Sequence, residues 1–233
     1  VSWNQLVQVD AGIQQNDLAV QAEAALDRVN AQMEGLNRSA RRFLRSRDMA
    51  DIAAARQAGE QAREALAAVT TKFERVDIVR REGPLLRERL DAQARALEAA
   101  VAAARQQNRN FDDFLGASAP MANVLRAVAD NAAARGGEPM RGAVDLATKF
   151  HESRAAVLRY VMTLQPNDAE SARHELARFA AAVAERRPTG QARVEQMLAA
   201  VTGRAPQYFS AADAVFSSMD RKNEAEAALG LAT

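Results

Sequence analysis

The sequence predicts an all-α protein whose six helices form two stacked antiparallel four-helix-bundle modules that share two long helices. Composition is the first indication: 48% of the residues are apolar but only 5% are aromatic, and alanine-rich helices pack closely around thin cores. Periodicity is the second, because apolar residues recur at steps of three and four. The third is that the sequence lacks alternating apolar runs bounded by turns, so we expect no strands.

The first pass of the chain begins with a long helix that carries a narrow apolar stripe over residues 18–43. Aspartates interrupt this helix at residues 48–51, and either of them can cap a new helix start. A second helix then runs to about residue 79. We expect the first reversal at residues 81–84, because glycine permits a turn and the proline after it suits a helix start.

The second pass is helical for residues 85–135, and Gly116 and Pro120 are expected to kink it. Two glycines and a proline within residues 136–139 predict the second reversal. A third pass follows, with one helix to about residue 165.

A Pro-Asn-Asp break at residues 166–168 divides the third pass, and Asp168 is expected to cap the next helix. The third reversal falls at residues 187–190. The last helix then covers residues 191–229, with a kink expected at Gly203 and Pro206.

Three reversals therefore join four passes, of which the first and third are broken in the middle. We expect one domain over residues 1–233 with two modules. One module comprises residues 1–47, 110–165 and 208–233, and the other comprises residues 48–109 and 166–207. If the two breaks are level, the first pass overhangs by roughly 30 Å at ~1.5 Å per residue. Either the first helix projects toward a membrane or partner, or this alignment of the passes is wrong.

A faint internal repeat appears when the chain is shifted by ~117 residues, so that the two mid-pass breaks coincide. The shift superimposes Arg42 on Arg159, Phe43 on Tyr160, Ser46 on Thr163, Asp51 on Asp168 and Ala55-Arg56 on Ala172-Arg173.

Several function classes are disfavoured by composition. The 31 basic and 30 acidic side chains are mixed along the chain, unlike a basic nucleic-acid-binding surface. Cysteine is absent and only His151 and His174 are present, so we expect no metal site, no cofactor and no catalytic centre. The sequence contains no apolar run of about 18 residues that could span a membrane.

A row of arginines on the first helix is the main chemical feature. Arg38, Arg42 and Arg45 share one helix face, with no acidic residue inside the run. Either this is a solvated basic face or a ladder of salt bridges, or it is an anion site, since guanidinium binds carboxylate bidentately.

The other passes bring polar and aromatic residues near the same level by residue count. Together with the first-helix arginines they could hold a small dicarboxylate. These are Arg159, Tyr160, Asn110, Ser217 and Arg221. Tyr208 lies nearer the other module, where a second pocket is possible.

The six-helix plan, the paired breaks at residues 48–51 and 165–168, and the first-helix arginines resemble the helical bimodular sensor domains of bacterial chemoreceptors and some sensor kinases. This resemblance implies a periplasmic domain between two membrane spans that binds an organic acid between helices. Arg38, Arg42 and Arg45 would match the first-helix arginines and Arg159 the fourth-helix arginine. Tyr208 would match a last-helix tyrosine, and Arg221 is the weaker match for a basic residue after it.

The resemblance also implies a homodimer that signals by a small displacement of its terminal helices. Helix-like sequence at both ends fits a fragment between two membrane spans. Two alternatives stay open. The chain could be a structural or adaptor bundle whose arginine row binds an acidic partner, or a sensor of the same fold that binds a partner binding protein.

Overall fold

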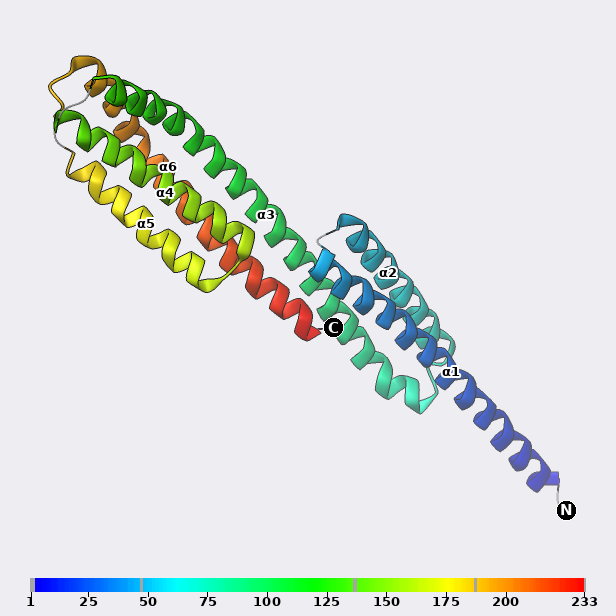
Figure 1. Ribbon diagram of the computed structural model, residues 1–233. Helices are drawn as coiled ribbons and strands as arrows, with labels where there is room; N and C mark the ends of the chain where they lie inside the picture. The colour runs from blue at the N-terminus through cyan, green and yellow to red at the C-terminus, as the bar shows by residue number, and fades with distance from the viewer. Residues whose placement is uncertain (1–2, 47, 136–137, 187, 233) are drawn as a thin grey trace. The chain divides into compact units, whose positions relative to one another are not determined.

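The computed structural model describes residues 3–46, 48–135, 138–186 and 188–232. These residues form six α-helices and no strand, which confirms the all-α prediction (Figure 1). The helices are α1 (Trp3–Ser46), α2 (Met49–Lys72), α3 (Asp77–Arg135), α4 (Glu138–Thr163), α5 (Pro166–Ala184) and α6 (Ala192–Ala232).

The chain forms two compact units. Unit 1 comprises Val1–Ala103 and Asn223–Thr233, and unit 2 comprises Ala104–Lys222. The long helices α3 and α6 each contribute residues to both units. The sequence predicts modules with other bounds, which group residues 1–47 with 110–165 and 208–233, and that grouping stays a prediction.

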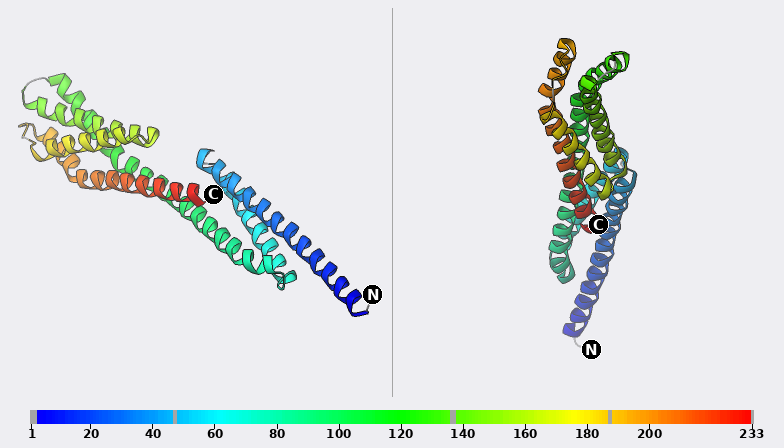
Figure 2. Two further views of the ribbon diagram at one scale, coloured as in Figure 1. Left: turned by 90° about the horizontal axis from the view of Figure 1, so that it is seen from below. Right: turned by 60° about the vertical axis from the view of Figure 1, so that its left-hand side comes forward.

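In unit 1, α1 and α2 form an antiparallel hairpin (Figures 1 and 2). Asp48 caps α2, because its side chain accepts a hydrogen bond from the Ala50 backbone N–H at 2.8 Å. The two helices approach so closely that a Cβ on Gly59 would lie 2.9 Å from Leu36 Cδ1. The interpretation of residues 48–51 as a break within one straight pass is therefore wrong. A polar cap satisfies the first amides of a helix whether the chain continues or turns back, so it does not indicate direction.

The next reversal also differs from the prediction. It falls at residues 73–76, and Gly83 and Pro84 lie inside α3. A Cβ on Gly83 would lie 3.1 Å from Thr70 Cγ2. Glycine at this position therefore permits close approach of α2 and α3 and does not make a turn.

The core of unit 1 is mainly aliphatic, with Phe43 and Phe73 as buried aromatic residues. Leu26, Leu36, Leu66, Val69 and Leu90 represent one cluster drawn from α1, α2 and α3. A second cluster includes Leu229 from the end of α6.

The first residues of α1 project beyond the end of α2 (Figure 1). Gln21 and Arg28 of α1 line the same surface depression as Lys72 at the end of α2. Leu18 and Val20, which precede them, are 46% and 58% exposed. The predicted alignment of the passes is therefore wrong, and projection of α1 toward a membrane or partner stays a prediction.

In unit 2, α4 and α5 form a second hairpin. Leu164 closes its turn with a φ of 58°, and α5 starts with Gln165 as N-cap and Pro166 in the first turn. The expectation that Asp168 caps α5 is wrong. Its carboxylate instead accepts a hydrogen bond from the Thr163 hydroxyl at 2.5 Å.

The remaining connections bear on the other two predicted reversals. Gly190, with a φ of 70°, lies in the turn between α5 and α6, which confirms the third reversal. The glycines of the second, Gly136 and Gly137, lie outside the described residues.

The core of unit 2 is aromatic. The rings of Phe114, Phe150, Phe179 and Tyr208 are in contact, with centroids 5.3–5.8 Å apart in the pairs that involve Tyr208. These four side chains come from α3, α4, α5 and α6 and are fully buried. Contacts between these rings add to the stabilisation that unit 2 gains from burying apolar surface.

The two hairpins have the same turn chemistry, as the internal repeat predicts. The Ser46 hydroxyl donates to Asp51 Oδ2 at 2.6 Å, and Thr163 makes the equivalent bond to Asp168. In each turn the backbone N–H two residues after the hydroxyl also donates to it.

The repeat continues into the long helices with a shift of ~115 residues. Four buried positions of α3 correspond in this way to four buried positions of α6. The pairs are Val79 with Val194, Leu90 with Ala205, Leu97 with Ala212 and Val101 with Phe216.

Candidate functional site

The arginine row of α1 is solvent-exposed and partly paired. Arg38 Nη1 lies 3.8 Å from the Glu34 carboxylate. Arg42 Nη1 lies 3.7 Å from Asp51, and the Arg42 side chain is 67% exposed. Arg45 is exposed as well. Two of the three guanidinium groups therefore already face a carboxylate of unit 1.

The predicted partners of this row belong to unit 2. Arg159, Ser217 and Arg221 are exposed on their helices. Tyr160 is buried and stacks on Phe216 with centroids 5.4 Å apart. The convergence of these residues with the α1 arginines stays a prediction.

Asn110 has a packing contact. Its Nδ2 donates a hydrogen bond to the Ala214 carbonyl at 2.9 Å, which joins α3 to α6 inside unit 2.

Tyr208 is a fully buried core residue. Its hydroxyl lies 2.9 Å from Ser153 Oγ, and burial raises the pKa of Tyr208 to about 12. The Ser153 hydroxyl also donates to the Phe150 carbonyl. Within the described residues, Tyr208 is thus surrounded by core side chains.

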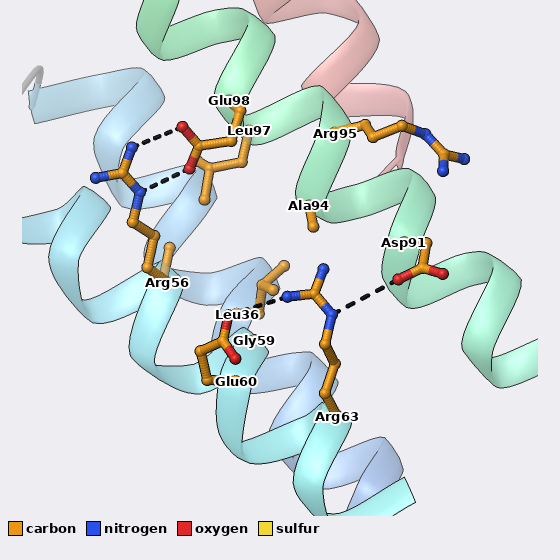
Figure 3. A pocket seen from close by; sticks show the side chains of 11 residues that line it. Leu36, Arg56, Gly59, Glu60, Arg63, Asp91, Ala94, Arg95, Leu97 and Glu98 are labelled. Carbon is orange, nitrogen blue, oxygen red and sulfur yellow. Dashed lines mark hydrogen bonds and ion pairs between the residues drawn. The ribbon is translucent and has the colours of Figure 1, made fainter. Parts of the chain in front are cut away.

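A concave surface of unit 1 lies between α2 and α3 and is called here the α2–α3 groove (Figure 3). Its volume is about 840 Å³. The apolar part of its lining is Leu36, Ala55, Gly59, Ala94 and Leu97. Leu36 of α1, a buried side chain, forms the floor of the groove between the small residues of the two helices.

Two ion pairs link α2 to α3 across this groove. Arg56 donates two hydrogen bonds to the Glu98 carboxylate, both at 2.6 Å, and this hydrogen bonding raises the pKa of Arg56. Arg63 Nε lies 3.6 Å from Asp91. The pairs are one heptad apart on each helix, which is roughly 10 Å at ~1.5 Å per residue.

Arg63 retains a free nitrogen. Its Nη1 donates to Glu60 at 3.0 Å and its Nε faces Asp91, whereas its Nη2 has no partner among the described residues. In Figure 3 this guanidinium lies between α2 and α3, near Ala94. An anion in the groove would therefore meet an available donor.

The arrangement suits a small anion with an apolar body. Arg56 and Arg63 supply positive charge at the two ends, and the floor between them is apolar. Their side chains are 45% and 42% exposed, and ion pairs at such exposure contribute little to stability. Both guanidinium groups therefore remain accessible to a ligand carboxylate.

Sequence reasoning missed this site because Glu60 and Arg63 are three residues apart, a spacing that is typical of an exposed ion pair within one helix. A usable indication was present: two arginines seven residues apart with Gly59 between them, and two acids, Asp91 and Glu98, also seven apart.

The described residues contain neither a group of three or more histidine, aspartate or glutamate side chains placed to hold a metal ion nor a helix apolar enough over sufficient length to cross a membrane. No protein-family model matches the chain, and no curated protein matches it. Geometry and charge of the described residues therefore define the candidate site.

Proposed function

We propose that the chain is the ligand-binding sensor domain of a bacterial transmembrane receptor and that it binds a small organic anion in the α2–α3 groove. The observation that carries this proposal is the combination in that groove of an apolar floor with Arg56 and Arg63 at its two ends. Guanidinium groups recognise carboxylates with defined geometry. In this proposal the chain is periplasmic, lies between two membrane spans and forms a homodimer.

The proposal extends to the fold. Unit 1 and unit 2 are the two bundle modules, and α3 and α6 are the shared long helices. Support comes from the contribution of each of these helices to both units and from the matching hydrogen bonds of the two hairpin turns.

Signalling in this proposal is mechanical. A ligand that contacts both α2 and α3 favours one relative position of the two helices over others. It does so by contacting Arg63 of α2 and the apolar side chains of α3 at the same time, while both ion pairs stay in place. A differential binding energy of about 1–3 kcal/mol suffices to couple binding to a distant output.

A second candidate is an adaptor whose groove receives a helix of a partner protein. A further depression of about 550 Å³ adjoins the α2–α3 groove and shares Asp91 and Arg95 with it, so the concave surface is long enough for several helical turns. A partner helix would have to break both ion pairs that cross the groove. A small ligand between the pairs would not, which favours the sensor.

A thermal-shift screen of organic acids tests the proposal, since a ligand that binds only the native state raises the melting temperature. We expect at least one acid to raise it and Arg63→Gln to abolish the shift. Arg193→Gln, which changes an exposed arginine of unit 2, is the matched control and should leave the shift intact.

Two further variants locate the site. If Arg42→Ala or Arg159→Ala abolished the shift and Arg63→Gln did not, the site would be the arginine cluster predicted from the sequence and not the groove. The absence of a shift with every acid, together with capture of a helical partner, would support the adaptor.

A further inference from the structure

The internal repeat shows what fills the equivalent of the groove in unit 2. With the shift of ~117 residues fixed by the hairpin turns, Gly59 corresponds to Leu176. With the shift of ~115 residues fixed by the burial pattern, Ala94 corresponds to Phe209. Two of the smallest residues of the groove therefore stand where the second repeat has large apolar side chains.

Phe209 of α6 closes the seam between α5 and α6. Leu176 is buried. The ring of Phe209 packs on Phe179 and Tyr208, with centroids 5.5 and 5.7 Å away. In unit 1 the same seam carries Gly59 and Ala94 and is open to a volume of about 840 Å³. The size of the α2–α3 groove thus follows mainly from the exchange of Phe209 for Ala94, because Gly59 is packed against Leu36 of α1.

The repeat also shows how the arginine of this seam can contact a ring. Arg173 corresponds to Arg56, and its guanidinium lies over the ring of Phe216 at 4.9 Å from the centroid. A guanidinium attracts the face of an aromatic ring. An aromatic group beside Arg56 would make the same kind of contact.

We propose that the α2–α3 groove binds an aromatic monocarboxylate. The ring occupies the place that Phe209 has in unit 2, over Leu36 and between Gly59 and Ala94. The carboxylate binds the free Nη2 of Arg63. This inference rests on the proposed function and specifies its ligand class.

The charge distribution disfavours a short dicarboxylate. The two ion pairs are roughly 10 Å apart, farther than a four-carbon dicarboxylate can reach with both ends. Its second carboxylate would lie over Leu36 and Leu97, apolar side chains that offer no hydrogen bond in place of its water, and burying an unpaired charge is costly. A single carboxylate with an apolar ring avoids this cost.

Isothermal titration calorimetry with phenylacetate and succinate tests the ligand class. We expect phenylacetate to bind at least about tenfold more tightly than succinate. Ala94→Phe, which installs the residue of the second repeat, should weaken phenylacetate binding by more than about tenfold because its ring fills the groove. Ala99→Phe, on the exposed face of the same helix, is the matched control and should bind as the parent protein does.

The outcomes separate this inference from the proposed function. Binding of succinate but not phenylacetate, lost in Arg63→Gln, would overturn the aromatic ligand class and leave the anion sensor standing. Binding of neither acid nor any other organic anion would overturn both. Tight phenylacetate binding that survives in folded Ala94→Phe would also overturn the placement of the ring. If circular dichroism shows that Ala94→Phe is not folded, Ala94→Leu replaces it. Weaker phenylacetate binding by Ala94→Leu would support the placement of the ring, and unchanged binding would overturn it.

Discussion

Because the phenol of Tyr208 is buried, we expect unit 2 to lose stability between about pH 10 and about pH 12. The pKa of Tyr208 is raised from 10.0 to about 12, chiefly by burial, whereas an unfolded tyrosine ionises near pH 10. The folded state therefore holds the phenolic proton more tightly. Its contribution is fully present below about pH 10 and disappears as the pH rises through about 12. Two pKa units at ~1.4 kcal/mol each amount to roughly 3 kcal/mol.

Tyr208→Phe isolates this contribution. At neutral pH the variant loses the hydrogen bond to Ser153, which costs about 0.5–1.5 kcal/mol; Ser153 keeps its bond to the Phe150 carbonyl. Between about pH 10 and about pH 12, the variant should lose less stability than the parent protein, by up to roughly 3 kcal/mol. Urea unfolding followed by circular dichroism at several pH values measures both effects.

An optical titration gives the deciding result. The chain has 2 tyrosines, so phenolate absorbance in Tyr160→Phe reports Tyr208 alone. If that absorbance appears near pH 10 while circular dichroism shows a folded protein, Tyr208 is accessible to solvent and the reasoning from burial is refuted.

Three further results are expected. A double-mutant cycle of Ser46→Ala and Asp51→Ala, measured by urea unfolding, should give a coupling energy of about 0.5–3 kcal/mol. Additive effects of the two substitutions would show that the Ser46–Asp51 hydrogen bond does not stabilise the turn. The pKa of Glu195 is lowered to about 2, mainly by the hydrogen bond from the Thr189 backbone N–H. The stability that the Glu195 carboxylate contributes is therefore present above about pH 4.5 and is lost as the pH falls toward 2. In an acid titration, Glu195→Gln should lose less stability over this pH range than the parent protein. Phe179→Ala should destabilise unit 2 by about 3–5 kcal/mol in denaturant unfolding, and a change below 1 kcal/mol would contradict the packing of the aromatic core.

Local features of the fold could be predicted from the sequence. The apolar period of α1, the proline at the start of α5 and the glycine between α5 and α6 each act within a few residues of the chain. The direction of the chain after residues 46–48 could not be predicted in the same way. A cap fixes where a helix begins, but the choice between continuing and turning back is made by packing of distant residues such as Leu36 and Gly59.

The site was harder to predict for a related reason. Its ion pairs depend on the register of α2 against α3, which the reversal at residues 73–76 sets. A Gly-Pro pair normally indicates a turn, so Gly83 and Pro84 moved the expected reversal and with it the partners of Arg56 and Arg63. In the structure Gly83 instead admits Thr70 at close range. A single sequence does not distinguish a glycine that permits close approach of two helices from a glycine that permits a turn.

The internal repeat allows the two units to be compared residue by residue, which the pattern of a single helix does not. Ser46 and Asp51 recur as Thr163 and Asp168 because a hydroxyl and a carboxylate five residues apart satisfy the same turn twice. Once this turn fixes the alignment, differences between the repeats become informative. Unit 2 uses its seam positions for packing, and the same positions in unit 1 hold residues too small to fill the space. A core closed by side chains needs no ligand, so the proposed binding role is assigned to the repeat whose seam stays open.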